Sequence, residues 1–309
     1  MTGAGTLESA SLPTCSVVIC TRDRPSELEQ CIALVRAGEH APTELIIVDS
    51  GPSSSASRLV AERLGVTYVV EEVAGLSRAR NRGARVATAD VVAYIDDDAR
   101  PDASWLRNLL LEFRDPTIAA VCGRCIPTFD PGTVAIAETM QHWWSNDTCR
   151  RVFSRDDDSW ADAAIGGRMG TGMNMAFRRR ALAGSAIFDT RLGRGAAVSS
   201  YEEHEALFSL VLHGERVVYT PEALVTHPVP GTQEAFARFR EDTRSAFVAY
   251  LLLLFTKYPQ ARRHIIGWTL RAGVRRKDVA SVSSRVTSPF AYLRAVAKGT
   301  ALFALASRR

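Results

Sequence analysis

The first 125 residues of the chain alternate between short apolar runs and longer amphipathic stretches, and this alternation constrains the fold more than any other feature. The runs are rich in β-branched residues and almost continuously apolar, as in strands that are buried on both faces of a sheet. Strands are expected at 16–20, 44–50, 66–70, 91–96 and 118–121. Helices are expected between them at 26–36, 56–64, 76–86 and 103–113, with Ser26 as the first N-cap. This spacing predicts βαβ units and an α/β fold with a mostly parallel sheet.

The remainder of the chain is less regular but shows no internal repeat and no long linker. Further strands are expected at 173–177, 216–219 and 223–225, a helix at 202–212, and helices from residue 233 onward. The predicted organisation is a flexible N-terminus at 1–13, one α/β domain at 14–230, and a helical C-terminal appendage at 231–309.

Composition excludes several classes of protein. Hydrophobic residues make up 46% of the chain, which is enough to bury a core, and six cysteines are too few for a disulfide scaffold. No apolar run approaches the roughly 20 residues that span a bilayer. The first residues lack the basic and apolar regions of a signal peptide. We therefore expect a cytoplasmic protein with reduced cysteines.

Charge is unevenly distributed along the chain. Residues 243–309 contain 13 Lys and Arg but one acid, Asp278, whereas the rest contains 25 basic and 33 acidic residues. A basic tail on an acidic body predicts contact with an anionic surface, such as the inner face of a membrane. The alternatives are a solvated helical face and a surface that packs on the catalytic domain or on a second subunit in a homodimer. We expect no nucleic-acid partner.

Three consecutive acids, Asp96, Asp97 and Asp98, follow the apolar run at 91–96. Carboxylates at the exit of a buried strand are costly unless they are solvated, paired or bound to a cation. Side chains two residues apart on an extended chain point the same way, so Asp96 and Asp98 are expected to share a site and Asp97 to point away. This pattern predicts a Mg²⁺ or Mn²⁺ site that also binds a substrate phosphate.

Four other motifs are interpreted as structural. Cys122 and Cys125 lack a second pair for zinc and are expected to be buried, reduced thiols on opposite strand faces. The acidic run at 156–158 has no strand before it and is expected to be solvated. The glycine-rich segment 166–172 does not match a dinucleotide-binding loop. The Trp143-Trp144 pair is expected to pack in the core rather than stack on a sugar.

Several motifs in register resemble those of family 2 glycosyltransferases with the GT-A fold, in which a Rossmann-like sheet is flanked by helices. The first three are Ser-Val-Val-Ile-Cys-Thr-Arg-Asp-Arg-Pro at 16–25, Glu-Leu-Ile-Ile-Val-Asp-Ser-Gly at 44–51 and Gly-Leu-Ser-Arg-Ala-Arg-Asn at 75–81. The later ones are Tyr-Ile-Asp-Asp-Asp at 94–98, Gly-Thr-Gly-Met-Asn-Met-Ala-Phe-Arg-Arg at 170–179 and Tyr-Glu-Glu-His-Glu at 201–205. The resemblance covers about 14–228 and implies a nucleotide-binding half at 14–125 and an acceptor-binding half at 126–230.

The resemblance also implies roles for particular residues. Asp49 would read the edge of the nucleotide base and Arg80 would lie near the diphosphate. Asp96 and Asp98 would form the D-x-D pair, with Asp98 on the metal and His227 as a third metal ligand. The expected donor-binding set is Thr21, Arg22, Asp49, Arg80, Asp96 and Asp97.

The catalytic base is expected in the pair Glu202-Glu203, where Glu203 stands at the position usually held by Asp. A carboxylate at a helix start is stabilised in its ionised form by the helix dipole. Since the signature of processive synthases is absent, the implied function is a non-processive, inverting transfer of one sugar. The donor would be a nucleotide-diphosphate sugar, UDP-type first. The acceptor stays open as a small molecule, a glycan or a lipid-linked sugar.

Two other functions remain as alternatives. A nucleotidyltransferase can share a similar sheet, but it would normally carry a glycine-rich basic loop after the first strand, where this chain has Thr21 to Pro25 without glycine. A catalytically dead nucleotide-sugar-binding or membrane-scaffolding protein is favoured by Glu203 in place of Asp and by the basic tail.

Overall fold

The computed structural model describes residues 11–129, 147–183, 187–229, 232–274 and 289–308. Within these ranges, eight strands form a sheet in the order β3-β2-β1-β4-β8-β6-β9-β5, and β7 pairs with β9 beside this path. Strands β1, β2, β3 and β4 are mutually parallel, as are β6 and β9, whereas β8 runs antiparallel to both β4 and β6. The sheet is therefore mixed but mostly parallel, as expected for the α/β class.

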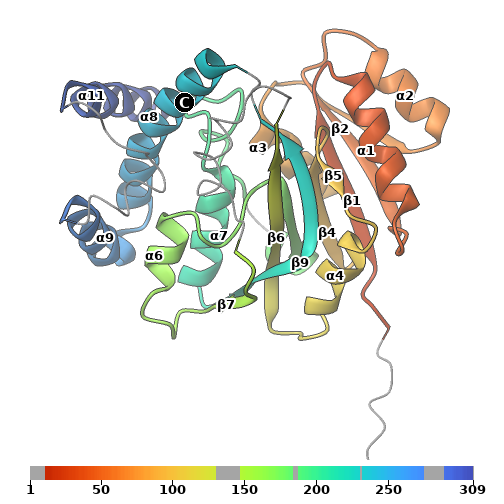
Figure 1. Cartoon of the computed structure of the whole chain (residues 1–309), viewed down its shortest axis with the longest axis horizontal. Coiled ribbons are helices and arrows are strands. Elements are labelled where there is room, and N and C mark those ends of the chain that lie inside the picture. Colours follow the sequence, from red (N-terminus) through yellow and green to blue (C-terminus); the bar gives the residue numbers. More distant parts are fainter. Residues whose placement is uncertain (1–10, 130–146, 184–186, 230–231, 275–288, 309) are drawn as a thin grey trace, which may run out of the picture.

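The elements follow one another in βαβ fashion before the helical C-terminus (Figure 1). The strands are β1 (Cys15–Thr21), β2 (Glu44–Ser50), β3 (Thr67–Glu71), β4 (Val91–Asp96), β5 (Arg100–Pro101), β6 (Ile118–Thr128), β7 (Arg151–Phe153), β8 (Asn174–Arg178) and β9 (Arg216–Pro228). The α-helices are α1 (Pro25–Ala37), α2 (Ala56–Leu64), α3 (Leu76–Val86), α4 (Trp105–Glu112), α6 (Trp160–Ile165), α7 (Glu202–Leu212), α8 (Gln233–Lys257), α9 (Arg262–Val274) and α11 (Pro289–Ala306). Two 3₁₀ turns, η1 (Arg179–Leu182) and η2 (Pro259–Ala261), complete the described set.

Both faces of the sheet are buried, which explains why its strands are almost wholly apolar. On β1, Val17 and Ile19 face one core cluster and Val18 faces the other, as a period of two requires. Helices α1, α2 and α4 cover the first face. Helices α3, α6 and α7 cover the second.

The C-terminal helices form a further layer outside α6 and α7 (Figure 1). Helix α8 contacts α9 and α11. Its residues Ala246, Phe247, Tyr250 and Leu254 are buried in the same core cluster as the second face of the sheet. The basic C-terminal segment is thus built into the core along one side of α8. No described helix is long and apolar enough to cross a membrane.

Three local predictions were wrong. Ser26 does not cap α1, because the helix begins one residue earlier at Pro25, whose fixed φ suits a first helical position. Strand β6 continues to Thr128 instead of ending at 121. The two short strands expected at 216–219 and 223–225 form one strand, β9, whose pairing with β6 skips from Thr220 to Leu224. A bulge there accommodates the residues between them, including a proline that cannot donate to the ladder.

The motifs interpreted as structural have varied outcomes. Cys122 and Cys125 are free and fully buried, and they lie in the two different core clusters, as predicted for opposite strand faces. Asp156 and Asp158 are solvent-exposed, as expected, although Asp157 is only half-exposed and lines the cavity described below. The Trp143-Trp144 pair and residues 1–10 lie outside the described residues.

Candidate active site

A cavity of about 1350 Å³ opens at the carboxyl ends of the parallel strands. Ligands bind at this edge in open α/β sheets, because the loops after neighbouring strands converge there. The ends of β1, β2 and β4 all reach it, as the sequence predicted, together with the segment before β8, the start of α7 and the middle of α8. Its volume exceeds the roughly 300–1000 Å³ of a small-molecule site, so it has room for two substrates.

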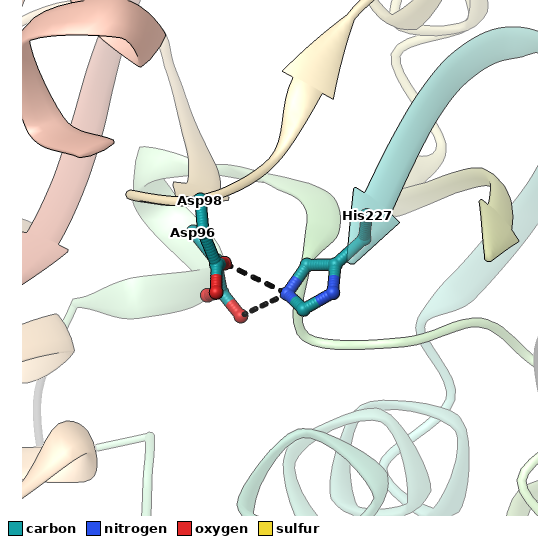
Figure 2. A group of neighbouring side chains, drawn as sticks. All are labelled: Asp96, Asp98 and His227. Atoms are coloured by element: carbon teal, nitrogen blue, oxygen red, sulfur yellow. Dashed lines mark ion pairs between the residues drawn. The ribbon is translucent and has the colours of Figure 1, made fainter. Parts of the chain in front are cut away.

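Asp96, Asp98 and His227 meet at one side of this cavity (Figure 2). His227 Nε2 lies 2.8 Å from Asp98 Oδ1 and 3.8 Å from Asp96 Oδ2. One ligand atom from each residue lies within 4.8 Å of the others. The fold explains this meeting, because Arg100, two residues after Asp98, pairs with Thr226, the residue before His227.

The donor atoms of this group suit a divalent cation. Two carboxylates provide hard oxygen ligands, and imidazole adds a nitrogen that favours Mn²⁺ over Mg²⁺. His227 Nδ1 lies 2.7 Å from the Pro228 carbonyl oxygen and can donate to it, which leaves Nε2 facing the two acids. A backbone partner of this kind fixes the orientation of a metal-binding histidine.

Arg24, which sequence reasoning missed, donates hydrogen bonds to both Asp97 and Asp98 after β4. Its Nη1 donates to Asp97 at 2.9 Å and its Nη2 donates to Asp98 at 2.7 Å. Asp97 points away from the cation group, as expected, and accepts a 2.7 Å hydrogen bond from Thr21 Oγ1. Burial raises the pKa of Asp97 to about 7. Burial also opposes ionisation of Asp98, but His227 and Arg24 hold its pKa below the usual range.

Arg80 is the buried cation at the centre of the site, with 2% of its side chain exposed. Its Nη1 lies 2.6 Å from Glu202 Oε1, and its Nη2 lies 3.4 Å from Asp96 Oδ1. Nη2 also donates to the Gly172 carbonyl oxygen at 3.0 Å. Burial lowers the pKa of Arg80, but Glu202 and Asp96 more than compensate, so the guanidinium stays charged. Glu202 is therefore held in an ion pair, although burial and the neighbouring Glu203 raise its pKa to about 7 against the effect of Arg80.

Both glutamates in the first turn of α7 line the cavity, and Glu203 is the more exposed, with 14% of its side chain exposed against 6% for Glu202. Glu203 Oε1 accepts the Gly172 backbone N–H at 3.2 Å and lies 3.4 Å from His204 Nδ1. Burial opposes ionisation of Glu203, but His204 and Arg80 lower its pKa. A carboxylate held in its ionised form and open to a cavity can accept a proton from a bound hydroxyl group.

Of the remaining predicted residues, Thr21 and Arg22 line the cavity but Asp49 does not. At the end of β2 the lining residue is Ser50. The Asp49 side chain is fully buried, and its Oδ2 accepts a 2.9 Å hydrogen bond from the Tyr68 hydroxyl. Its Oδ1 has no hydrogen-bond partner among the described residues. Burial raises the pKa of Asp49, and the Tyr68 bond opposes that rise.

Sequence reasoning missed three groups that shape the site. Arg24 lies three residues after β1, in the segment 16–25, but no feature of the neighbouring sequence indicates that its side chain reaches the acids after β4. His204 was visible as the neighbour of Glu203. Gly172 lies in the glycine-rich segment, and glycine is needed there for a steric reason, because a Cβ at this position would lie 2.8 Å from Arg80 Nη2.

Comparisons with known proteins agree with this geometry. The Glycosyl transferase family 2 model matches residues 16–182. A glucosyl-dolichyl phosphate glucuronosyltransferase of Haloferax volcanii is 28% identical over 222 residues, covering 69% of this chain and 68% of that protein. The succinoglycan biosynthesis protein ExoM of Rhizobium meliloti is 27% identical over 227 residues, covering 71% of this chain and 68% of that protein.

Solved structures show the same fold. The mannosyltransferase PcManGT of Pyrobaculum calidifontis, in complex with GDP-Man and Mn²⁺, matches with a TM-score of 0.57 at 18% identity, covering 97% of this chain and 76% of that one. TarS of S. aureus, in complex with UDP-GlcNAc, matches with a TM-score of 0.60 at 12% identity, covering 94% of this chain and 81% of that one. The chain belongs to glycosyl transferase family 2 and is a glycosyltransferase with the GT-A fold.

Proposed function

We propose that the chain transfers one sugar, with inversion, from a nucleotide-diphosphate donor to an acceptor hydroxyl group in a non-processive reaction. The observation that carries this proposal is that one cavity contains two different chemical groups. The candidate cation-binding group Asp96, Asp98 and His227 lines it together with the Glu203 carboxylate. Arg80 lies between them and contacts both Asp96 and Glu202.

The residues divide the reaction as follows. Glu203 accepts the proton of the acceptor hydroxyl, whose oxygen then forms the new bond to the anomeric carbon of the sugar as the bond to the diphosphate breaks. Asp96, Asp98 and His227 would hold Mn²⁺ or Mg²⁺, which would neutralise the charge that develops on the departing diphosphate. Arg80 adds a fixed positive charge on the same side. The relatives solved with GDP-Man and Mn²⁺ or with UDP-GlcNAc support a donor of this class.

We also propose that the outer surface of α9 binds anionic membranes. Ile266 and Leu270 are 49% and 65% exposed, one turn apart on α9. Arg262 and Arg263 are exposed on the same side of the helix, and the sequence of α9 contains no acid. An apolar stripe beside basic residues is typical of helices that lie in the headgroup region. A lipid-linked acceptor, one of the three acceptor classes, would make such binding useful.

The metal proposal predicts that Asp98→Asn weakens Mn²⁺ binding at least tenfold, because one of three ligands loses its charge. Calorimetric titration of the UDP-bound protein with Mn²⁺ measures this, and UDP release from a UDP-sugar reports turnover. Asp156→Asn, which removes an exposed acid outside the cavity, is the matched control and should behave as the wild type. Full turnover in excess EDTA would contradict the proposal.

The base proposal predicts that Glu203→Gln lowers turnover about 10²–10⁴-fold while UDP-sugar binding persists, since a general base contributes roughly that much. Glu203→Asp should keep part of the activity. Glu202→Gln should instead lower the free energy of unfolding by about 2–4 kcal/mol, because it leaves buried Arg80 short of a charged partner. If Glu202→Gln is stable but inactive and Glu203→Gln is active, the base is Glu202.

The donor proposal predicts that UDP binds more tightly than dTDP or GDP, and CDP least. Once donor binding exposes it, the Asp49 carboxylate, whose Oδ1 has no hydrogen-bond partner among the described residues, accepts the N3–H of uracil but repels the N3 lone pair of cytosine. Asp49→Ala should weaken UDP binding without changing the metal requirement, and a calorimetric panel of nucleotides measures both. Tyr68→Phe removes the hydroxyl bound to Asp49 but keeps the carboxylate, so an equal loss of affinity in both variants would mean that Asp49 acts only through packing.

The membrane proposal predicts salt-sensitive co-sedimentation with vesicles that contain anionic lipid. Each engaged basic residue adds about 1 kcal/mol, which salt screens. The double substitution Ile266→Ser and Leu270→Ser should reduce binding. Leu59→Ser, at a 60% exposed leucine on α2, is the matched control. Absence of binding at low salt, or binding that high salt leaves unchanged, would be the contrary result.

A further inference from the structure

Tyr201 holds an unusual backbone conformation directly before the two glutamates of the site. Its φ is +77°, and Asp23 is the only other described non-glycine residue with a positive φ. Asp tolerates this region, whereas for a bulky residue such as Tyr it is strained. Such a conformation persists only where surrounding contacts enforce it. Since α7 begins at Glu202, the turn at Tyr201 sets the direction in which the helix starts.

The contacts that enforce this turn come from α8. The Tyr201 ring stacks on the fully buried Tyr250 ring, with centroids 5.0 Å apart and planes inclined by 13°. Phe247 packs against the same ring at 5.4 Å. The Tyr201 hydroxyl donates to the Thr243 carbonyl oxygen at 3.3 Å. The strained residue is therefore held in an aromatic socket, formed by Phe247 and Tyr250, with Thr243 at its rim.

The socket is itself anchored to α7 and connected to the cavity. Lys257, the last residue of α8, lies 2.8 Å from Glu205 Oε1 in the first turn of α7. Phe247 makes an edge-on contact with Trp268 of α9 at 5.4 Å. Thr243, at the rim, lines the cavity. Helix α8 thus fixes the start of α7 from two directions and provides part of the cavity wall.

Tyr201 also packs against His204, the α7 side chain that lies beside the Glu203 carboxylate. The Tyr201 ring lies 5.3 Å from the His204 ring, and His204 Nδ1 lies 3.4 Å from Glu203 Oε1. On the other side, Gly167, which has a φ of +71°, leaves room for His204, because a Cβ there would lie 2.4 Å from His204 Nε2. A rotation of the first turn of α7 would therefore move Glu203 and His204 together.

We infer that the C-terminal helix α8 positions the catalytic base, with Tyr201 and Tyr250 as positioning residues that hold the first turn of α7. This inference rests on the proposed role of Glu203. A displacement of about 1 Å in a reacting group can cost as much as 100-fold in rate. Loosening the socket should therefore lower kcat, while the donor and cation, held by other elements, bind as before.

The test compares three substitutions in α8 under conditions where all are folded. Tyr250→Leu removes the stacked ring and should lower kcat for UDP release from a UDP-sugar at least tenfold, with KM for the donor within about twofold. Tyr250→Phe keeps the ring and should restore kcat, because the Tyr250 hydroxyl has no hydrogen-bond partner among the described residues. Leu254→Ala, at a fully buried core residue of the same helix, is the matched control for general loss of packing and should leave kcat near wild type.

Hydrogen exchange followed by mass spectrometry provides a readout without turnover. Tyr250→Leu should speed exchange of backbone amides in 201–206, including Glu205, whose N–H donates to the Tyr201 carbonyl oxygen at 3.0 Å, but not in β1 or β4. Unchanged exchange there, or a kcat no lower than that of Leu254→Ala, would overturn the inference. If the wild type consumes no nucleotide sugar, the proposed function fails, and the exchange result still decides whether α8 holds this turn.

Discussion

The buried guanidinium of Arg80 is the interaction on which the rest of the site depends. Removing a charge from water costs several kcal/mol, and a buried carboxylate without a cation beside it tends to take up a proton. Hydrogen bonds from Arg80 to Glu202, to Asp96 and to the Gly172 carbonyl oxygen offset this cost. Three separate segments, the exit of β4, the start of α7 and the segment before β8, are thereby fixed around one cation. Arg80 opposes the rise that burial causes in the pKa of Glu202 and of Asp96, and the two carboxylates in turn keep the guanidinium charged.

This arrangement also explains the glycine-rich segment before β8. Gly172 gives its carbonyl oxygen to Arg80 and its N–H to Glu203, so one peptide link connects the cationic centre to the proposed base. Any side chain at this position would collide with the guanidinium. The segment resembles a nucleotide-binding loop only in composition. Its glycine is required by close packing of the backbone against Arg80.

The sequence predicted those features that depend on neighbouring residues along the chain. The continuous apolar runs marked strands buried on both faces, and the period of two placed Asp96 and Asp98 together with Asp97 opposed. Contacts between distant segments left no such local signal. His227 was expected near the acids only through a family resemblance, and the bond from Arg24 was missed, since its side chain gives no sign of reaching β4. The strain at Tyr201 was invisible for the same reason, because it exists only when α8 packs against α7.

The C-terminal segment shows why location matters more than summed charge. Part of its positive charge is matched by acids: Lys257 pairs with Glu205 and Asp189, Arg271 with Asp162, and, within the C-terminal helices, Arg294 with Glu241 and Lys298 with Asp242. Lys257 and Arg271 thus connect the C-terminal helices to α7 and α6, whereas the pairs of Arg294 and Lys298 connect α11 to α8.

The exposed surface that could meet an anionic partner is smaller than the composition of the tail suggested. On α9 this surface consists of the exposed stripe of Ile266 and Leu270 beside Arg262 and Arg263. The inner surface of α8 meanwhile contacts the first turn of α7. The C-terminal helices therefore present two different surfaces: α8 faces inward, where its aromatic rings hold Tyr201, and α9 faces outward, where its cations are available to an anionic surface. Because Ile266 and Leu270 are exposed and lie outside the core cluster that holds Tyr201, substituting them should leave the socket intact and so separate the two proposed roles.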